Sequence, residues 1–148
     1  MLFRSKLNVG GNNFNSVQID SASDATLVDV NTITVLATTT SGFYRVSGTG
    51  ITLDGAIHAG GKVTLEASSS AAGVTLRNNI QTADSDVDLI GTVLLTTHDP
   101  VITTGTGIVR FSGNNPIRIG SRTLTVDAFQ FDGTPTLFLT IEIGRAHV

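Results

Sequence analysis

The sequence predicts an all-β protein that is wound as a parallel β-helix of about six coils, each of roughly 23 residues. The first observation is an internal repeat, because the segment Gly50–Leu65 is followed by a second version of itself, Gly73–Leu89. Gly50 recurs as Gly73, and Val63 recurs as Val87 after one additional loop residue. The second observation is a recurring apolar-polar-apolar triplet, and the third is the turn-forming residues between the triplets. Units this small must stack on their neighbours to bury their apolar face.

The triplets mark the predicted strands in order along the chain. Alternation with a period of two, rich in β-branched residues, is typical of a strand that buries one face. A β-sandwich would use longer strands, and no stretch has the apolar spacing of a helix. The predicted strands are Val17–Ile19, Ile33–Val35, Ile51–Leu53, Val63–Leu65, Val74–Leu76, Val87–Leu89, Ile117–Ile119, Leu124–Val126 and Phe129–Phe131. The alternation places Val63, Leu65, Val74, Leu76, Val87 and Leu89 inside, and Thr64, Thr75 and Asp88 outside.

Glycine and asparagine clusters predict the corners between these strands, because both residues tolerate positive φ angles. The clusters are Gly10–Asn13, Asp54–Gly55, Gly60–Gly61, Gly105–Gly107 and Gly113–Asn115. The repeat continues in a third, less regular copy, in which Ile102 follows Ile80 at nearly the same interval. The region before Gly50 is also less regular, and there we expect Thr38–Gly42 to form a protruding loop.

The composition narrows the possible functions. The chain has 148 residues, enough for one domain, and only 14% of them are charged, with a net charge of −3. A charge-poor, mildly acidic chain is poorly suited to nucleic acid, which requires clustered lysine and arginine. There is no cysteine, and no stretch approaches the roughly 18 apolar residues of a membrane span. We therefore expect no nucleic-acid partner, no membrane insertion by this segment and no cofactor.

Both termini resemble translated sequencing-library adapter. The last seven residues, Glu142–Val148, can be back-translated into the adapter sequence GAG ATC GGA AGA GCA CAC GTC. The first five, Met1–Ser5, can be back-translated into its reverse complement. We therefore expect residues 1–5 and 142–148 to be adapter-derived artefacts, and residues 6–141 to be a β-helix repeat fragment of a longer protein.

Three strings carry a resemblance to a known family: Gly50-Ile-Thr-Leu-Asp-Gly-Ala-Ile57, Gly61-Lys-Val-Thr-Leu65 and Ile80-Gln-Thr-Ala-Asp-Ser-Asp-Val-Asp-Leu89. They resemble the repeats of filamentous-haemagglutinin-like bacterial adhesins, over about residues 48–131. These large exported proteins fold as right-handed parallel β-helices. The resemblance implies a right-handed coil, a secreted or outer-surface location, and a structural or adhesive role without catalysis. It also implies two partners: flanking coils of the same chain, and a host or environmental surface ligand, for which a glycan is one candidate.

One acidic segment is a weak candidate for a calcium site. Asp84, Asp86 and Asp88 alternate, so on a single strand their carboxylates would face the same side. Calcium prefers several such oxygens at close range. The alternative is an exposed strand face with a structural role. No other metal ligands and no catalytic residues are predicted.

The remaining polar residues leave an enzymatic alternative open. His58 and His98 are expected in turn regions, without a nucleophile nearby in sequence. Four arginines occupy mostly polar strand positions: Arg45, Arg77, Arg110 and Arg118. Together with the scattered aspartates they could line the groove of a carbohydrate-active β-helix, such as a polysaccharide lyase or hydrolase. An enzyme would need its carboxylates to converge in one cleft, whereas a stalk would show them dispersed over the surface.

Overall fold

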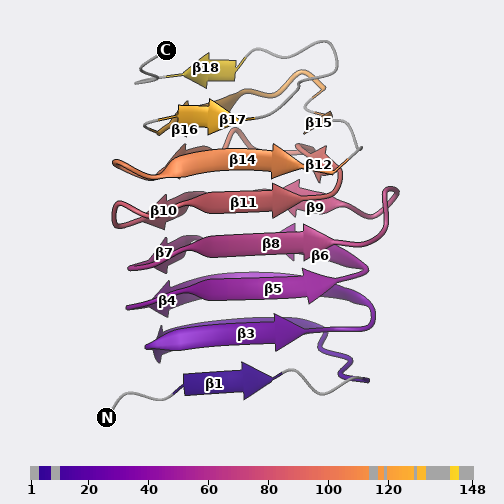
Figure 1. Cartoon of the computed structure of the whole chain (residues 1–148). Helices are drawn as coiled ribbons and strands as arrows, with labels where there is room; N and C mark the ends of the chain where they lie inside the picture. Colours follow the sequence, from indigo (N-terminus) through magenta and orange to yellow (C-terminus); the bar gives the residue numbers. More distant parts are fainter. Residues whose placement is uncertain are drawn as a thin grey trace.

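The strands wind into a right-handed parallel β-solenoid of about five turns (Figure 1). The computed structural model describes residues 4–7, 11–113, 117–118, 120–128, 130–132 and 141–143. In Figure 1 the coils stack from the N-terminus at the bottom to the C-terminus at the top, and the front strands all run in one direction. The described residues contain no helix. The predicted fold class is confirmed, with roughly the number of coils expected.

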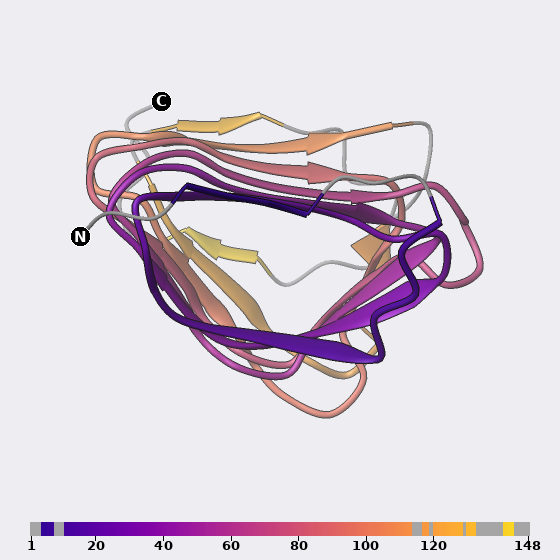
Figure 2. The same ribbon diagram turned by 90° about the horizontal axis from the view of Figure 1, so that it is seen from below.

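Each complete coil contributes three strands, so the solenoid has three faces, and Figure 2 shows its three-sided outline. Face A is a seven-stranded sheet, and an 11-stranded sheet forms faces B and C. These two faces share β4 (Thr32–Thr40), whose residues 32–35 pair on face B and whose residues 38–40 pair on face C. In addition, β2 (Ser16–Ala22) pairs with β4 along both faces.

The strands of each face, in stacking order, are as follows. Face A contains β1 (Arg4–Leu7), β3 (Asp24–Val28), β5 (Tyr44–Gly48), β8 (Val63–Ala67), β11 (Val87–Ile90), β14 (Ile108–Ser112) and β17 (Gln130–Asp132). Face B continues from β4 through β6 (Gly50–Leu53), β9 (Val74–Leu76), β12 (Val93–Leu94) and β15 (Ile117–Arg118). Face C continues from β4 through β7 (Ile57–Ala59), β10 (Ile80–Thr82), β13 (Val101–Thr103), β16 (Leu124–Asp127) and β18 (Ile141–Ile143).

The register of the ladders confirms the repeat found in the sequence. Val63 pairs with Val87, and Val87 pairs with Val109 in the next coil. On face C, Ile80 likewise lies between Ile57 and Ile102. Side chains one coil apart in the sequence therefore stack directly on one another.

The earlier coils are shorter, which explains why the region before Gly50 looked irregular. Ala25, Tyr44 and Val63 are successive register partners, and each of these steps is several residues shorter than the step from Val63 to Val87. The triplets did not identify β3 and β5, because small Ala25 and aromatic Tyr44 stand where later coils have valine. The same columns nevertheless continue through these strands.

The interior is filled by stacked apolar columns. On face A, Leu27, Val46, Leu65 and Leu89 follow one another and are each 0% exposed. Fully burying a valine or leucine side chain contributes about 1.5–3 kcal/mol, so these columns supply much of the folding free energy. All six side chains predicted to point inward are buried, namely Val63, Leu65, Val74, Leu76, Val87 and Leu89.

Three threonines are more buried than the sequence suggests. Thr38–Thr40 do not belong to a protruding loop but to β4, and Thr38 and Thr40 are buried. Their hydroxyls donate hydrogen bonds to the carbonyls of Leu36 and Gly42 at 3.1 and 3.0 Å, which allows burial at the corner. Thr75 was expected outside, yet it is only 8% exposed because it stacks between Thr52 and Leu94 on face B.

Some residues of the two terminal segments take part in the ladders. Arg4 and Ser5 pair with Asp24 and Ala25 in face A. At the other end, Glu142 and Ile143 pair with β16 in face C. Residues 1–3 and 144–148 lie outside the described residues. The adapter origin of both segments stays a prediction, because nearly every residue type can form the main-chain hydrogen bonds of a ladder.

Candidate functional site

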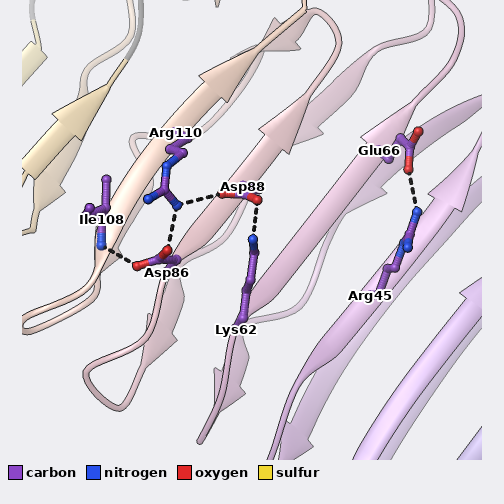
Figure 3. A network of polar contacts seen from close by, with 7 residues as sticks. All are labelled: Arg45, Lys62, Glu66, Asp86, Asp88, Ile108 and Arg110. Atoms are coloured by element: carbon purple, nitrogen blue, oxygen red, sulfur yellow. Dashed lines mark hydrogen bonds and ion pairs between the residues drawn. The ribbon is translucent and has the colours of Figure 1, made fainter.

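The outward surface of face A carries a network of ion pairs that links successive coils (Figure 3). Arg110 Nη1 lies 2.6 Å from Asp86 Oδ2 and 3.4 Å from Asp88 Oδ1. Lys62 Nζ of the preceding coil lies 2.5 Å from Asp88 Oδ2. One coil further back, Arg45 Nη2 contacts Glu66 Oε2 at 3.0 Å. The charges follow the strand register, because Asp88 and Arg110 are direct neighbours in the ladder.

This network favours the charged form of Asp86. The hydrogen bond from Arg110 lowers the pKa of Asp86, and the Ile108 N–H, which donates to Asp86 Oδ1 at 2.9 Å, lowers it further. The hydrogen bond to Asp86 also raises the pKa of Arg110. A general acid needs a carboxyl whose pKa is raised. The pKa of Asp86 is shifted in the opposite direction. The arrangement suits a structural clamp between coils.

The calcium candidates do not share a strand. β11 begins at Val87, so Asp84 and Asp86 lie in the turn that precedes it, and the expected alternation along one strand was wrong. Asp84 has a φ of 54°, a left-handed conformation that aspartate tolerates better than most residues. Its Oδ1 accepts a hydrogen bond from the Thr106 N–H at 3.1 Å.

The carboxylates of Asp84, Asp86 and Asp88 contact basic side chains or backbone N–H groups of the protein. Asp86 and Asp88 come together, but around Arg110 rather than around an empty space (Figure 3). The part of the chain that the structure describes has no group of three or more His, Cys, Asp or Glu side chains placed to hold a metal ion. Asp84, Asp86 and Asp88 therefore stay only weak candidates for calcium, and the ion would have to compete with Arg110 and Lys62 for Asp86 and Asp88.

Several aspartates and one asparagine link coils through backbone amides, a role the sequence analysis missed. In each case the side-chain oxygen accepts from an N–H in the following coil, 19–24 residues later in the chain. Such bonds satisfy backbone donors at corners, where the ladder is interrupted. The pairs are Asp24 with Phe43, Asn79 with Val101, Asp84 with Thr106, Asp86 with Ile108, and Asp99 with Thr123. The sequence signal that could have identified these residues is an Asp or Asn at the start of a strand or within three residues before it.

The histidines and arginines considered for catalysis are dispersed. His58 is not in a turn as expected but in β7, where it is exposed on face C. His98 lies in the loop after β12, and its Nδ1 is 2.8 Å from Thr97 Oγ1. Arg77 pairs with Asp54 at 3.4 Å at the corner between faces B and C. Arg118 is exposed on face B, so these arginines do not meet Arg45 and Arg110 of face A.

Two shallow grooves mark the surface of the described residues. The first, of about 290 Å³, lies on face C, and its exposed wall is formed by Thr39, His58 and Gln81. The second, of about 330 Å³, lies at the corner between faces A and B and contains Asp29 and Glu66. Both of these carboxylates are engaged: Asp29 accepts from the Phe14 and Asn31 N–H groups, and Glu66 pairs with Arg45.

Comparison of the chain with family models, curated proteins and solved structures gives no match. Within the described ranges, no helix is long and apolar enough to cross a membrane.

Proposed function

We propose that this chain is a structural and adhesive repeat segment of a large exported bacterial surface protein, such as an adhesin stalk, and that it has no catalytic activity. The proposal rests on one observation: the polar side chains form contacts between successive coils. Ion pairs on face A and aspartate or asparagine hydrogen bonds at the corners join each coil to the next. These contacts add to the backbone ladders along the solenoid axis (Figure 1).

A solenoid of this kind is suited to holding a binding region away from a cell. Each coil contacts only its neighbours, so the length grows with the number of coils while the cross-section stays constant. In the complete coils that the structure describes, tension along the axis would be shared by the parallel ladders of three faces. The corner hydrogen bonds supplement the ladders where these are interrupted. The architecture therefore favours a mechanical role.

The natural neighbours of the described coils are further coils. β2 pairs with β4 on one edge, and among the described residues its other edge has no partner. Phe14, Val17 and Ile19 are only partly buried against the core at this end. An open strand edge beside half-buried apolar side chains is a template for another strand. We propose that flanking coils of the same parent chain occupy it.

The alternative is a carbohydrate-active β-helix. Its best location is the groove between faces A and B, where Asp29 and Glu66 meet. Catalysis there would require one carboxyl to exchange protons with a substrate. Asp29 is 5% exposed and held by two backbone N–H groups, while Glu66 is paired with Arg45. These engagements favour a structural role for both side chains.

Force spectroscopy tests the mechanical proposal. The chain has no cysteine, so Asn13→Cys and Ser121→Cys would attach handles before β2 and between β15 and β16, and the coils between them would bear the load. We expect the chain to unravel coil by coil, because each coil is held mainly by its neighbours. Release of one coil would lengthen the chain by about 60–80 Å, since an extended residue spans about 3.3–3.6 Å.

Two variants sharpen this measurement. Asp86→Asn weakens the contacts of one coil with the next and should lower the force of one step, whereas the exposed Arg118→Gln should leave all steps unchanged. A chain that extends fully before any measurable force peak would contradict the mechanical role.

A further inference from the structure

We infer that the groove on face C binds a neutral oligosaccharide, an inference that rests on the proposed adhesive function and locates its contact surface. The groove has a volume of about 290 Å³ and crosses three coils. Its exposed wall is a row of three register partners, Thr39, His58 and Gln81. The groove is therefore built by strands that are distant in sequence and adjacent in space.

The hollow beside this row is a fixed property of the coil packing. Gly60 and Ala83 lie at its edge. A Cβ atom at position 60 would lie 2.1 Å from the Ser41 carbonyl oxygen of the preceding coil, so a larger residue could not fill this position without moving the backbone. Buried Thr40 forms part of the floor and donates its hydroxyl to Gly42 O. The Thr40 side chain of the floor is thus fixed by an internal hydrogen bond.

The wall, by contrast, has its hydrogen-bonding groups available. Within the described part of the chain, the side chains of Thr39, His58 and Gln81 make no hydrogen bond to protein. A hydroxyl, an imidazole and a carboxamide together offer both donors and acceptors. Polyhydroxylated sugars present the complementary mixture of donors and acceptors, at many points along their length.

The charge of the groove argues for a neutral ligand. No Asp, Glu, Lys or Arg lines it, whereas phosphate or nucleic acid would require basic side chains. On face A, Lys62 and Arg110 are already paired with aspartates and are poorly placed to recruit an acidic glycan. The polar wall also lacks the apolar anchors that a hydrophobic peptide would need.

The spacing of the row sets the direction of the ligand. Neighbouring strands lie about 4.8 Å apart, and Thr103 continues the row after Gln81. A linear oligosaccharide would therefore lie along the solenoid axis and meet one polar side chain per coil. Repetition of weak contacts of this kind is an effective basis for adhesion, because their combined affinity exceeds that of each alone.

Titration of the ¹⁵N-labelled full chain with three neutral trisaccharides tests this inference: maltotriose, cellotriose and N,N′,N″-triacetylchitotriose, with trigalacturonate as the acidic counterpart. We expect at least one neutral trisaccharide to shift the amide signals of His58 and Gln81 in a saturable way. The double variant His58→Ala/Gln81→Ala should weaken this binding at least tenfold. The matched control Lys62→Gln/Arg110→Gln on face A should leave it unchanged, and the dispersion of the spectra shows that each variant is folded.

Absence of saturable shifts with all three neutral trisaccharides would overturn the inference. It would also be overturned if only trigalacturonate binds and Lys62→Gln/Arg110→Gln removes that binding. Neither result bears on the stepwise unravelling under force, so failure of the groove can be distinguished from failure of the stalk.

Discussion

Replacing Val87 by aspartate is expected to destabilise the protein by several kcal/mol, on the order of 3–5, which is a large part of the stability of a domain this size. Val87 is 0% exposed and stacks between Val63 and Val109 in the inner column of face A. An aspartate side chain here would be surrounded by apolar groups with no cation to pair with. It would either remain charged at high cost or take up a proton, and both outcomes favour unfolding.

The matched control is Thr64→Asp, one coil earlier on the outward side of the same face. Thr64 pairs in register with Arg45 and Asp88, so a new carboxylate there would meet both an attractive and a repulsive charge in solvent. Its effect should stay within about 0.5–1 kcal/mol. Urea denaturation followed by far-UV circular dichroism measures both variants. Equal losses at positions 64 and 87 would mean that the inward and outward faces are assigned wrongly.

A second large effect is expected at alkaline pH. Tyr44 is 0% exposed, and burial raises its pKa to about 12, although the neighbouring Thr38 hydroxyl partly opposes the increase. In the folded structure the Thr38 hydroxyl donates to the Leu36 carbonyl and not to Tyr44, whose buried hydroxyl makes no hydrogen bond, so burial decides the direction of the shift. Ionisation is therefore disfavoured in the folded state relative to an unfolded chain, in which tyrosine titrates near 10.

The direction of the pH effect follows from the linkage between the ionisation of Tyr44 and the free energy of unfolding. Because the pKa is higher in the folded state, the contribution is fully present below about pH 10 and is lost as the pH rises towards 12. A shift of about two units corresponds to about 2–3 kcal/mol. Tyr44 is the only tyrosine and the chain has no tryptophan, so its phenolate absorbance near 295 nm reports this one group. We expect this absorbance to rise together with unfolding.

Tyr44→Phe isolates the effect. Phenylalanine fills nearly the same volume and cannot ionise, so this part of the alkaline loss should disappear while stability at neutral pH is kept. If Tyr44 titrates near pH 10 in a chain that remains folded, its side chain is reached by solvent and the core packing described above is wrong at this position.

The strands of this solenoid could largely be predicted from the sequence because alternation determines which side chains are buried. The register from Val63 to Val87 and from Ile80 to Ile102 follows directly from the repeat spacing. The strands β3 and β5 of the shorter early coils were not predicted, because Ala25 and Tyr44 occupy a column that later coils fill with valine. Burial of Thr38 and Thr75 depends on contacts in neighbouring coils, which no local pattern contains.

The polar surface was less predictable for the same reason. The sequence drew attention to Asp84, Asp86 and Asp88, but not to Arg110 and Lys62 as the groups that engage the latter two. The face C groove brings together side chains from three coils, and His58 lies far from Gln81 in the sequence. Spatial neighbours on a solenoid are separated by one coil length, so local motifs do not identify such sites.

Turnover of acidic polysaccharides is the measurement that tests the proposed non-catalytic role most directly. The chain would be incubated with polygalacturonate and alginate, and both reducing ends and unsaturated products absorbing near 235 nm would be followed. The stalk interpretation predicts no product above that of a buffer control, because Asp29 and Glu66 are engaged in structural contacts. Product that forms in proportion to protein concentration, and is abolished by Asp29→Asn or Glu66→Gln, would contradict it and assign the groove between faces A and B to an enzyme.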